Sequence, residues 1–257
     1  MNQHVETPVL PLLTDLDHLL YERQIQLPEF GAAAQQKMKR ATVMISRVGG
    51  LGGTVAMLLA RAGIGRLILA HDGVVEHENL NRMPLAFREH LGQPRMQVFA
   101  DTLHQINPDV ELITDDASVS RANAERLIDP ADMIVDAAPL FEERYAMNQE
   151  AVRQRKPLVM AAMFGLEGYV STFLPGKTPC LACVYPEAPD YWNLRVFPVL
   201  AASSTLIAAI ATMEAVKVIT GYGDTLANTL LYCDLENYQF QRLHIQKNPA
   251  CAVCSHL

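Results

Sequence analysis

The segment from residue 41 to residue 70 constrains the fold most, because it holds two strand patterns joined by a glycine-rich turn and a helix pattern. The run Ala41-Thr-Val-Met-Ile-Ser46 is short, apolar and β-branched, and the turn Val-Gly-Gly-Leu-Gly-Gly53 follows it. Apolar residues from Thr54 to Arg61 suit a helix packed on a sheet, and Arg66-Leu-Ile-Leu-Ala70 is typical of a second strand. This order predicts a right-handed βαβ unit with parallel strands.

The same alternation continues along the chain. We expect helices from about Arg95 to Ile106 and around Glu142 to Gln154, and strands near Val110 to Ile113, Met133 to Asp136 and Leu158 to Met160. The last third predicts paired antiparallel strands from Gly165 to Leu174, a long helix over about Ser203 to Thr220 and a hairpin of Thr229 to Asp234 with Gln239 to Ile245. The predicted fold class is α/β, a Rossmann-like, doubly wound and mainly parallel sheet with a C-terminal antiparallel extension.

Length and charge narrow the class of protein further. Half of the 257 residues are hydrophobic and 19% are charged, which suffices for a sizeable core. We expect residues 1–20 to form an N-terminal arm and residues 21–257 a single domain. The 21 basic and 28 acidic residues give a net charge of −7, which argues against nucleic acid or an anionic membrane as the main partner.

The N-terminal sequence and one apolar run bear on location. The first twenty residues lack a basic region and contain Glu6, Asp15 and Asp17, so we expect neither a signal peptide nor a transit peptide. We therefore expect the protein to be cytoplasmic. The uncharged run from Val196 to Met213 approaches the length of a membrane span, but it contains Pro198 and several hydroxyl residues. We interpret it as part of a buried core helix.

Four of the five cysteines form two Cys-x-x-Cys pairs: Cys180 with Cys183, and Cys251 with Cys254. Stable disulfides are not expected in the cytoplasm, and four thiolates at this spacing match a structural, tetrahedral zinc site. Free thiols or a redox pair are the alternatives, since 67 residues separate the two pairs. A shell of four cysteines is closed, so the metal would stabilise the fold without performing chemistry. We interpret Cys233, in a predicted strand, as a small buried hydrophobe.

Two further groups of residues suit a phosphate ligand, although each is a weak signal alone. The glycine turn would let backbone N–H groups approach phosphate, but Arg47 occupies the place of the first glycine. The segments Glu78-Asn-Leu-Asn-Arg82 and Gly92-Gln-Pro-Arg95, with Arg23 upstream, supply arginines that can neutralise a polyphosphate. Without further context, each arginine is more readily interpreted as a solvated surface charge.

The order of all these motifs is far more specific than any one of them. Tyr21-x-Arg-Gln, the glycine turn, Arg-Ala-Gly-Ile-Gly65, Glu-Asn-Leu-Asn-Arg82, Gly-Gln-Pro-Arg95, Ile-Asn-Pro108, the cysteine pairs and Met-Glu-Ala-Val-Lys217 follow one another in register over about residues 20–256. In this order the chain resembles the ThiF/MoeB/HesA family, whose members are similar to ubiquitin-activating enzymes.

The resemblance implies a homodimer that binds ATP and Mg²⁺ and adenylates a carboxylate. That carboxylate belongs either to the C-terminal glycine of a ubiquitin-like sulfur carrier or to a small biosynthetic acid. The resemblance also implies a nucleotide-binding half over about residues 21–164 and a zinc- and partner-binding half over about residues 165–257. The catalytic residues would be Arg23, which reaches the neighbouring subunit's site, Arg82 and Arg95. The nucleotide would contact Gly49, Gly50, Gly52, His71, Asp72, Asn79, Arg82, Arg95 and Asp136.

Several positions depart from the family pattern. Besides Arg47 in the glycine turn, His71 stands where the family has a ribose-binding acid, and Arg95 replaces a lysine. Pro139 occupies the position of the aspartate that organises Mg²⁺, so we expect Asp72 or Asp136 to help hold the metal. Two functions therefore compete: a divergent adenylyltransferase, and a non-catalytic member that acts as a carrier-docking module. A nicotinamide-dependent oxidoreductase fits less well, because the complete glycine fingerprint is missing.

Overall fold

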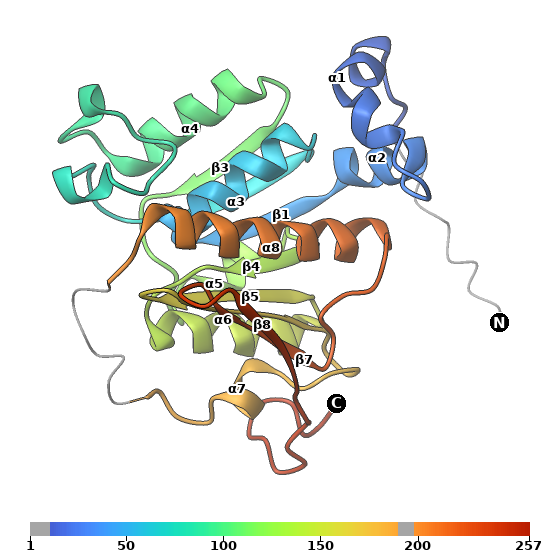
Figure 1. Ribbon diagram of the computed structural model, residues 1–257, viewed down its shortest axis with the longest axis vertical. Helices are drawn as coiled ribbons and strands as arrows, with labels where there is room; N and C mark the ends of the chain where they lie inside the picture. Colours follow the sequence, from blue (N-terminus) through green and yellow to red (C-terminus); the bar gives the residue numbers. More distant parts are fainter. Residues whose placement is uncertain (1–10, 190–197) are drawn as a thin grey trace.

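The computed structural model describes residues 11–189 and 198–257, whose centre is an eight-stranded sheet of order β3-β2-β1-β4-β5-β6-β7-β8 (Figure 1). The strands are β1 (Thr42–Ser46), β2 (Arg66–Ala70), β3 (Glu111–Asp115), β4 (Met133–Asp136), β5 (Leu158–Phe164), β6 (Glu167–Phe173), β7 (Thr229–Asp234) and β8 (Gln239–His244). Strands β1 to β5 pair in parallel, and the pairs β5–β6, β6–β7 and β7–β8 are antiparallel. The α/β fold class, with its antiparallel C-terminal extension, is confirmed.

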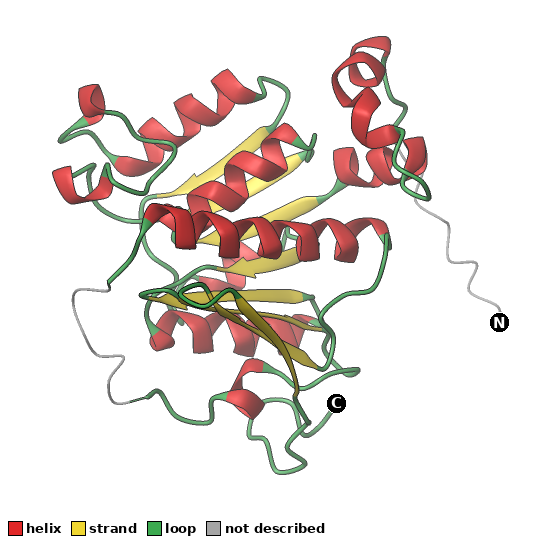
Figure 2. Cartoon of the chain, viewed as in Figure 1, coloured by secondary structure: helices red, strands yellow, loops and turns green. Residues whose placement is uncertain are grey.

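Helices cover both faces of this sheet (Figure 2). They are α1 (Asp15–Ile25), α2 (Gly31–Arg40), α3 (Gly50–Arg61), α4 (Arg95–Ile106), α5 (Ala124–Ile128), α6 (Phe141–Gln154), α7 (Leu181–Val184) and α8 (Ala201–Thr220), with short 3₁₀ turns η1 (His77–Asn79) and η2 (Arg88–His90). Alternation along β1 explains the layers: Val43 and Ile45 join the core under α3, α4 and α8, whereas Met44 joins the core under α5 and α6. A strand buried on both faces reads as a continuous apolar run, as the sequence of β1 does.

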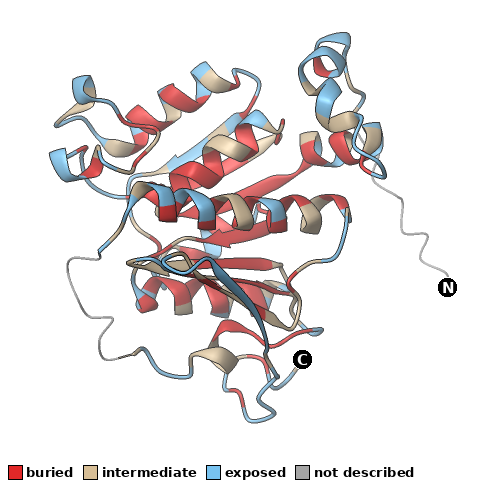
Figure 3. Cartoon of the chain, in the orientation of Figure 1, coloured by how far each residue is buried: buried red, intermediate tan, exposed pale blue. Residues whose placement is uncertain are grey.

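Helix α8 is the one helix among the described residues that is long and apolar enough to cross a membrane. Half of its most apolar stretch is buried inside the protein, and its residues Ile207, Ala208 and Ala211 have no exposed surface. It lies against α3, β5 and β6, as expected for a core helix (Figure 3). The first two residues of the apolar run predicted from Val196 lie outside the described residues.

The predicted and observed boundaries differ in three informative places. Helix α3 begins at Gly50 rather than Thr54, because the glycines of the turn themselves form its first turn. The antiparallel partner of β6 is β5, which continues past Met160 to a turn at Gly165, where φ is +61°. Helix α1 begins at Asp15 after a capping box at Thr14, so regular structure starts before residue 20, the expected end of the arm.

The position of the site follows from the strand order. Strand β2 lies on one side of β1 and β4 on the other, so the chain reverses its direction of winding at the carboxyl ends of β1 and β4. Open α/β sheets bind ligands at this point. Helix α2 precedes β1 and lies at the opposite end, where the Lys37 ammonium donates to the Thr220 carbonyl at the end of α8, 2.5 Å away.

Candidate functional site

A cavity of about 820 Å³ lies at the carboxyl ends of β1, β2, β4 and β5. Its polar lining residues and glycines are Arg47, Gly49, Gly50, His71, Glu78, Asn79, Asn81, Arg82, Arg95, Arg144 and Ser204. Its apolar lining residues are Leu51, Met83, Ala137, Ala138, Pro139, Leu140, Ala161, Ala162, Met163, Pro198 and Val199. The volume is in the range of small-ligand sites, and the lining combines cations with apolar side chains.

The glycine turn is shaped by backbone sterics. Arg47 has φ of +52°, in the left-handed region, which explains why a glycine is the ordinary residue at this position. A Cβ at Gly52 would lie 2.5 Å from the Arg47 carbonyl oxygen, so no other residue fits there. Gly50 allows the Arg82 side chain to approach within 3.1 Å of where its Cβ would stand. Gly49 and Gly50 line the cavity, whereas Gly52 supports the turn from behind.

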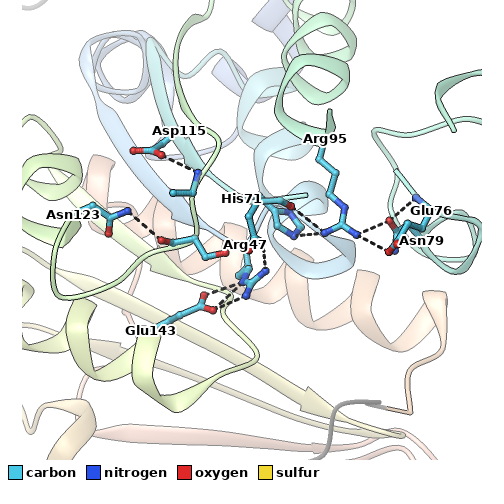
Figure 4. Close-up of polar contacts among 11 residues, drawn as sticks. Arg47, His71, Glu76, Asn79, Arg95, Asp115, Asn123 and Glu143 are labelled. Carbon is cyan, nitrogen blue, oxygen red and sulfur yellow. Dashed lines mark hydrogen bonds and ion pairs between the residues drawn. The ribbon is translucent and has the colours of Figure 1, made fainter. Parts of the chain in front are cut away.

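Arg47 joins three elements through ion pairs (Figure 4). Its Nη1 lies 2.6 Å from Asp72 Oδ1, just after β2, and its Nη2 lies 2.7 Å from Glu143 Oε1 on α6. Glu143 is buried, and burial raises the pKa of its carboxyl while the Arg47 charge opposes that rise. The charge of Arg47 is therefore compensated by two carboxylates of the protein itself.

Arg95 opens α4 and lies beside His71 (Figure 4). Its Nη2 donates to Asn79 Oδ1 at 2.9 Å and to Glu76 Oε2 at 3.3 Å, and its Nη1 lies 3.3 Å from His71 Nε2. Burial, followed by the charges of Arg95 and Arg47, lowers the pKa of His71 to about 4. The imidazole is therefore neutral near pH 7 and accepts from Arg95 at Nε2, since a guanidinium has only donors.

Pro139 lines the cavity at the family's aspartate position, and the nearby Asp136 does not replace it. Asp136 is fully buried, where it accepts from Arg144 Nη1 at 2.9 Å and from the Ala138 amide at 3.0 Å. Burial raises the pKa of this carboxyl, against the effect of Arg144. Asp72 likewise points to Arg47, and neither carboxylate lines the cavity. The arrangement argues against the expected metal role of Asp72 and Asp136.

Arg23 lies far from this cavity in its own chain. It is an exposed residue of α1, on the side of the sheet where β1 begins. Helix α8 links that side to the cavity: its Ser204 lines the cavity, and its last residue contacts α2. Its 20 residues span about 30 Å. Any contact of Arg23 with such a cavity would have to be made in another subunit, and that role stays a prediction.

The four paired cysteines come together in one cluster. Their sulfur atoms all lie within 4.8 Å of one another, with 3.7 Å between Cys180 and Cys251 and 3.5 Å between Cys183 and Cys254. A tetrahedral ion with metal–sulfur bonds of about 2.3 Å would place its sulfur ligands about 3.8 Å apart. The Asn148 side chain donates to Cys180 Sγ at 3.6 Å and accepts from the Leu181 amide at 2.9 Å. The cluster can therefore hold a metal ion.

Cys233 is buried with no exposed surface, as predicted, and burial raises the pKa of its thiol to about 11. Sequence reasoning missed Arg144 and Glu143, which connect α6 to the cavity. One signal was available. Asp136 ends an apolar strand, where an acid needs a partner, and Arg144 is the first basic residue that follows it in the sequence.

A glycine turn and a cavity at the switch point of a doubly wound sheet define the class of Rossmann-like, nucleotide-binding folds. The chain belongs to the ThiF family, which it matches over residues 21–253, so the family resemblance is confirmed.

Comparison with individual proteins agrees with this family. The chain is 43% identical over 242 residues to the heterocyst protein HesA of Trichormus variabilis, covering 94% of this chain and 90% of that protein. It is 35% identical over 245 residues to the sulfur carrier protein adenylyltransferase of Thermus thermophilus, covering 91% and 89%. A crystal structure of E. coli MccB with ATP superposes with a TM-score of 0.81 at 25% identity, covering 91% of this chain and 74% of MccB.

Proposed function

We propose that the chain is an adenylyltransferase-type protein that binds ATP and activates the carboxylate of a partner, the C-terminus of a ubiquitin-like sulfur carrier or a small biosynthetic acid. The cavity, whose lining combines arginines and glycines with small apolar side chains, carries this proposal. Phosphates suit the wall of arginines and glycine amides, and a slender carboxylate-bearing group suits the wall of Ala161, Ala162 and Met163. The names of two relatives support it, since one adenylylates a sulfur carrier and one was crystallised with ATP.

In the proposed reaction an oxygen of the carboxylate attacks the α-phosphorus of ATP. The bond between the α-phosphorus and its bridging oxygen breaks, pyrophosphate leaves, and an acyl-adenylate forms. The first turn of α3 would direct backbone N–H groups at the phosphates, and Asn79, Arg82 and Arg95 would orient them and neutralise the leaving group. His71 would contact the ribose at the end of β2. The cytoplasm remains the expected location.

We propose zinc for the cysteine cluster, because four thiolates in tetrahedral spacing are the ligands that structural zinc prefers. The ion would tether the C-terminus to the segment after β6. Val152 packs into the same small core as three of the cysteines, so the site also anchors the end of α6.

A homodimer is the further expectation, and α1 supports it. Leu16, Leu19 and Leu20 are each more than half exposed on this helix, beside Arg23. A second copy that covered these leucines would bury apolar surface and leave Arg23 close to the partner. Light scattering tests the expectation: a dimer has twice the 28.4 kDa of one chain, whereas a lone chain at micromolar concentration would contradict it.

The alternative function is a docking module that keeps the fold without the chemistry. Pro139 at the family's aspartate position favours it, as do the ion pairs that already compensate Arg47 and Arg95. Pyrophosphate exchange with candidate carriers, together with calorimetry of ATP binding, separates the two functions. Exchange above the level of an Arg82→Ala variant supports the adenylyltransferase. A folded, zinc-containing chain that binds no ATP would leave only the docking module.

A further inference from the structure

The wall of the cavity is rich in cations and poor in carboxylates. Four arginines line it, namely Arg47, Arg82, Arg95 and Arg144, and among the described residues Glu78 is the only acidic residue that does. Mg²⁺ takes oxygen ligands, and protein sites hold it through one or two carboxylates besides the phosphates of the substrate. The donor set of this wall suits an anion rather than a divalent cation.

Other carboxylates lie near the cavity, but each points to an arginine. Asp72 and Glu143 pair with Arg47, Glu76 pairs with Arg95, and Asp136 pairs with Arg144, at distances of 2.6 to 3.3 Å. Moving Glu76 or Asp136 to a metal would leave Arg95 or Arg144 without a carboxylate partner, and Arg144, which is 3% exposed, lies inside the core. Moving Asp72 would leave Arg47 with Glu143 alone. The residues described here therefore do not fit the Mg²⁺ that the family resemblance implies.

The imidazole of His71 is no substitute ligand. Its Nε2 faces Arg95, so the lone pair on that nitrogen is already used. On the same wall, Arg95 Nε is buried without a hydrogen-bond partner among the described residues. An unsatisfied buried donor calls for an acceptor, and the oxygens of a phosphate are acceptors. Arg82 adds a cation that no carboxylate of the described residues compensates, since its Nη1 donates to the Glu78 carbonyl and to Asn81 Oδ1.

We propose that this cavity binds its nucleotide as the free polyanion, with arginines in the role that Mg²⁺ has elsewhere in the family. The inference rests on the proposed function, since it assumes that a nucleotide enters the cavity. Mg²⁺ in solution then competes with the protein for the phosphates, because it neutralises part of the charge that the arginines attract. Binding also weakens with added salt.

Calorimetric titration of the full chain with ATP, once in EDTA and once in excess Mg²⁺ at matched ionic strength, tests the proposal. We expect ATP to bind at least as tightly in EDTA as in Mg²⁺, and severalfold more tightly if the arginines contact all three phosphates. Binding that appears only with Mg²⁺, or that Mg²⁺ strengthens tenfold, would overturn the proposal and leave the proposed function standing. No binding in either buffer would remove the proposed function and this inference with it.

A matched pair of variants sharpens the test. Pro139→Asp places a carboxylate on the wall and should convert the cavity to one in which Mg²⁺ strengthens ATP binding. Pro139→Asn has the same size without the charge and should keep the metal-independent behaviour. An equal gain of Mg²⁺ dependence in both variants would contradict the proposal. It would show that the proline ring, rather than the missing charge, determines how Mg²⁺ affects the affinity for ATP. If Pro139→Asp does not fold, the comparison of the two buffers with the unaltered chain decides alone.

Discussion

The cysteine cluster matches the family pattern at every ligand position, whereas the cavity at the sheet edge departs from it at several side chains. The cluster keeps all four donor atoms, drawn from two segments on either side of α8, β7 and β8. The cavity keeps its backbone while the side chains at positions 47, 71, 95 and 139 have changed. A four-cysteine metal site has no spare ligand, so one substitution removes it. A nucleotide cavity is shaped largely by backbone, and it survives substitutions that alter what it binds.

The charges around the cavity add to this contrast between the two regions. The changed residues do not leave loose charges, because Arg47 and Arg95 each have carboxylate partners within the protein. This compensation stabilises the fold around the cavity. The two regions can therefore be disturbed separately, one through its cysteines and one through its ion pairs.

The cluster offers the largest effect. Cys254→Ser should abolish stoichiometric zinc and lower the free energy of unfolding by about 5 kcal/mol, which corresponds to roughly 15 °C in Tm for a chain of this size. Elemental analysis and thermal unfolding measure the two quantities. Cys233→Ala is the matched control, since that cysteine is buried outside the cluster and its loss should leave about one zinc per chain. Unchanged metal content and Tm in Cys254→Ser would contradict the assignment of zinc.

Arg47 offers the next effect, because its loss would leave the carboxylate of Glu143 buried without a cation. Arg47→Ala should lower the free energy of unfolding by about 3 kcal/mol, as for other broken buried pairs. Arg47→Gly should recover about 1 kcal/mol of that loss, since glycine accepts the left-handed backbone at this position. Denaturant unfolding provides the measurement.

The pair Arg66–Glu111 supplies the control for Arg47, because both side chains are more than a third exposed. Arg66→Ala should cost less than about 1 kcal/mol. Equal losses in Arg47→Ala and Arg66→Ala would show that the Arg47 network adds nothing beyond a surface ion pair, and the contrast between the two regions would weaken.

The sequence predicted the scaffold of both regions, because their signals are local. Strand β2, strand β4 and helix α4 have the bounds expected from apolar periodicity and from the glycine and proline that precede α4. The two Cys-x-x-Cys pairs could be assigned to one metal site without knowledge of the fold, because few other sites use four thiols at that spacing.

The ion pairs of the cavity could not be predicted in the same way. Arg47 meets Glu143 across 96 residues of sequence, and Asp136 meets Arg144 only because α6 packs on β4. Asp136 and Asp72 were expected to hold a metal because sequence shows which carboxylates are near a motif, but not where they point. Long-range pairing of charges depends on the packed geometry, which local patterns do not contain.

The buried His71 gives the stability of the cavity region a pH dependence of its own. The pKa of this imidazole is about 4 in the folded chain and about 6.5 when unfolded, so the unfolded chain binds more protons between these values. Stability should therefore fall as the pH drops through this window, by about 2 kcal/mol at pH 5 from this residue alone. His71→Asn should flatten the profile of unfolding free energy against pH. His104→Gln, on the exposed face of α4, should leave it unchanged. A profile that is identical in the unaltered chain and in His71→Asn would show that His71 is not held neutral.

The smallest effect concerns Arg82, whose charge no carboxylate of the described residues compensates. Because its side chain lies over Gly50 at the start of α3, it is placed to meet the phosphates that the helix N-terminus attracts. Arg82→Ala should weaken ATP binding about tenfold, or about 1.4 kcal/mol, with a change in unfolding free energy below about 0.5 kcal/mol. Arg88→Ala, an exposed arginine of the neighbouring turn η2, controls for a general loss of positive charge and should leave the affinity within about twofold. Equal weakening of ATP binding by the two substitutions would mean that the cavity attracts the nucleotide only through the positive electrostatic potential of the whole region. The arginine wall would then have no specific contact with the phosphates.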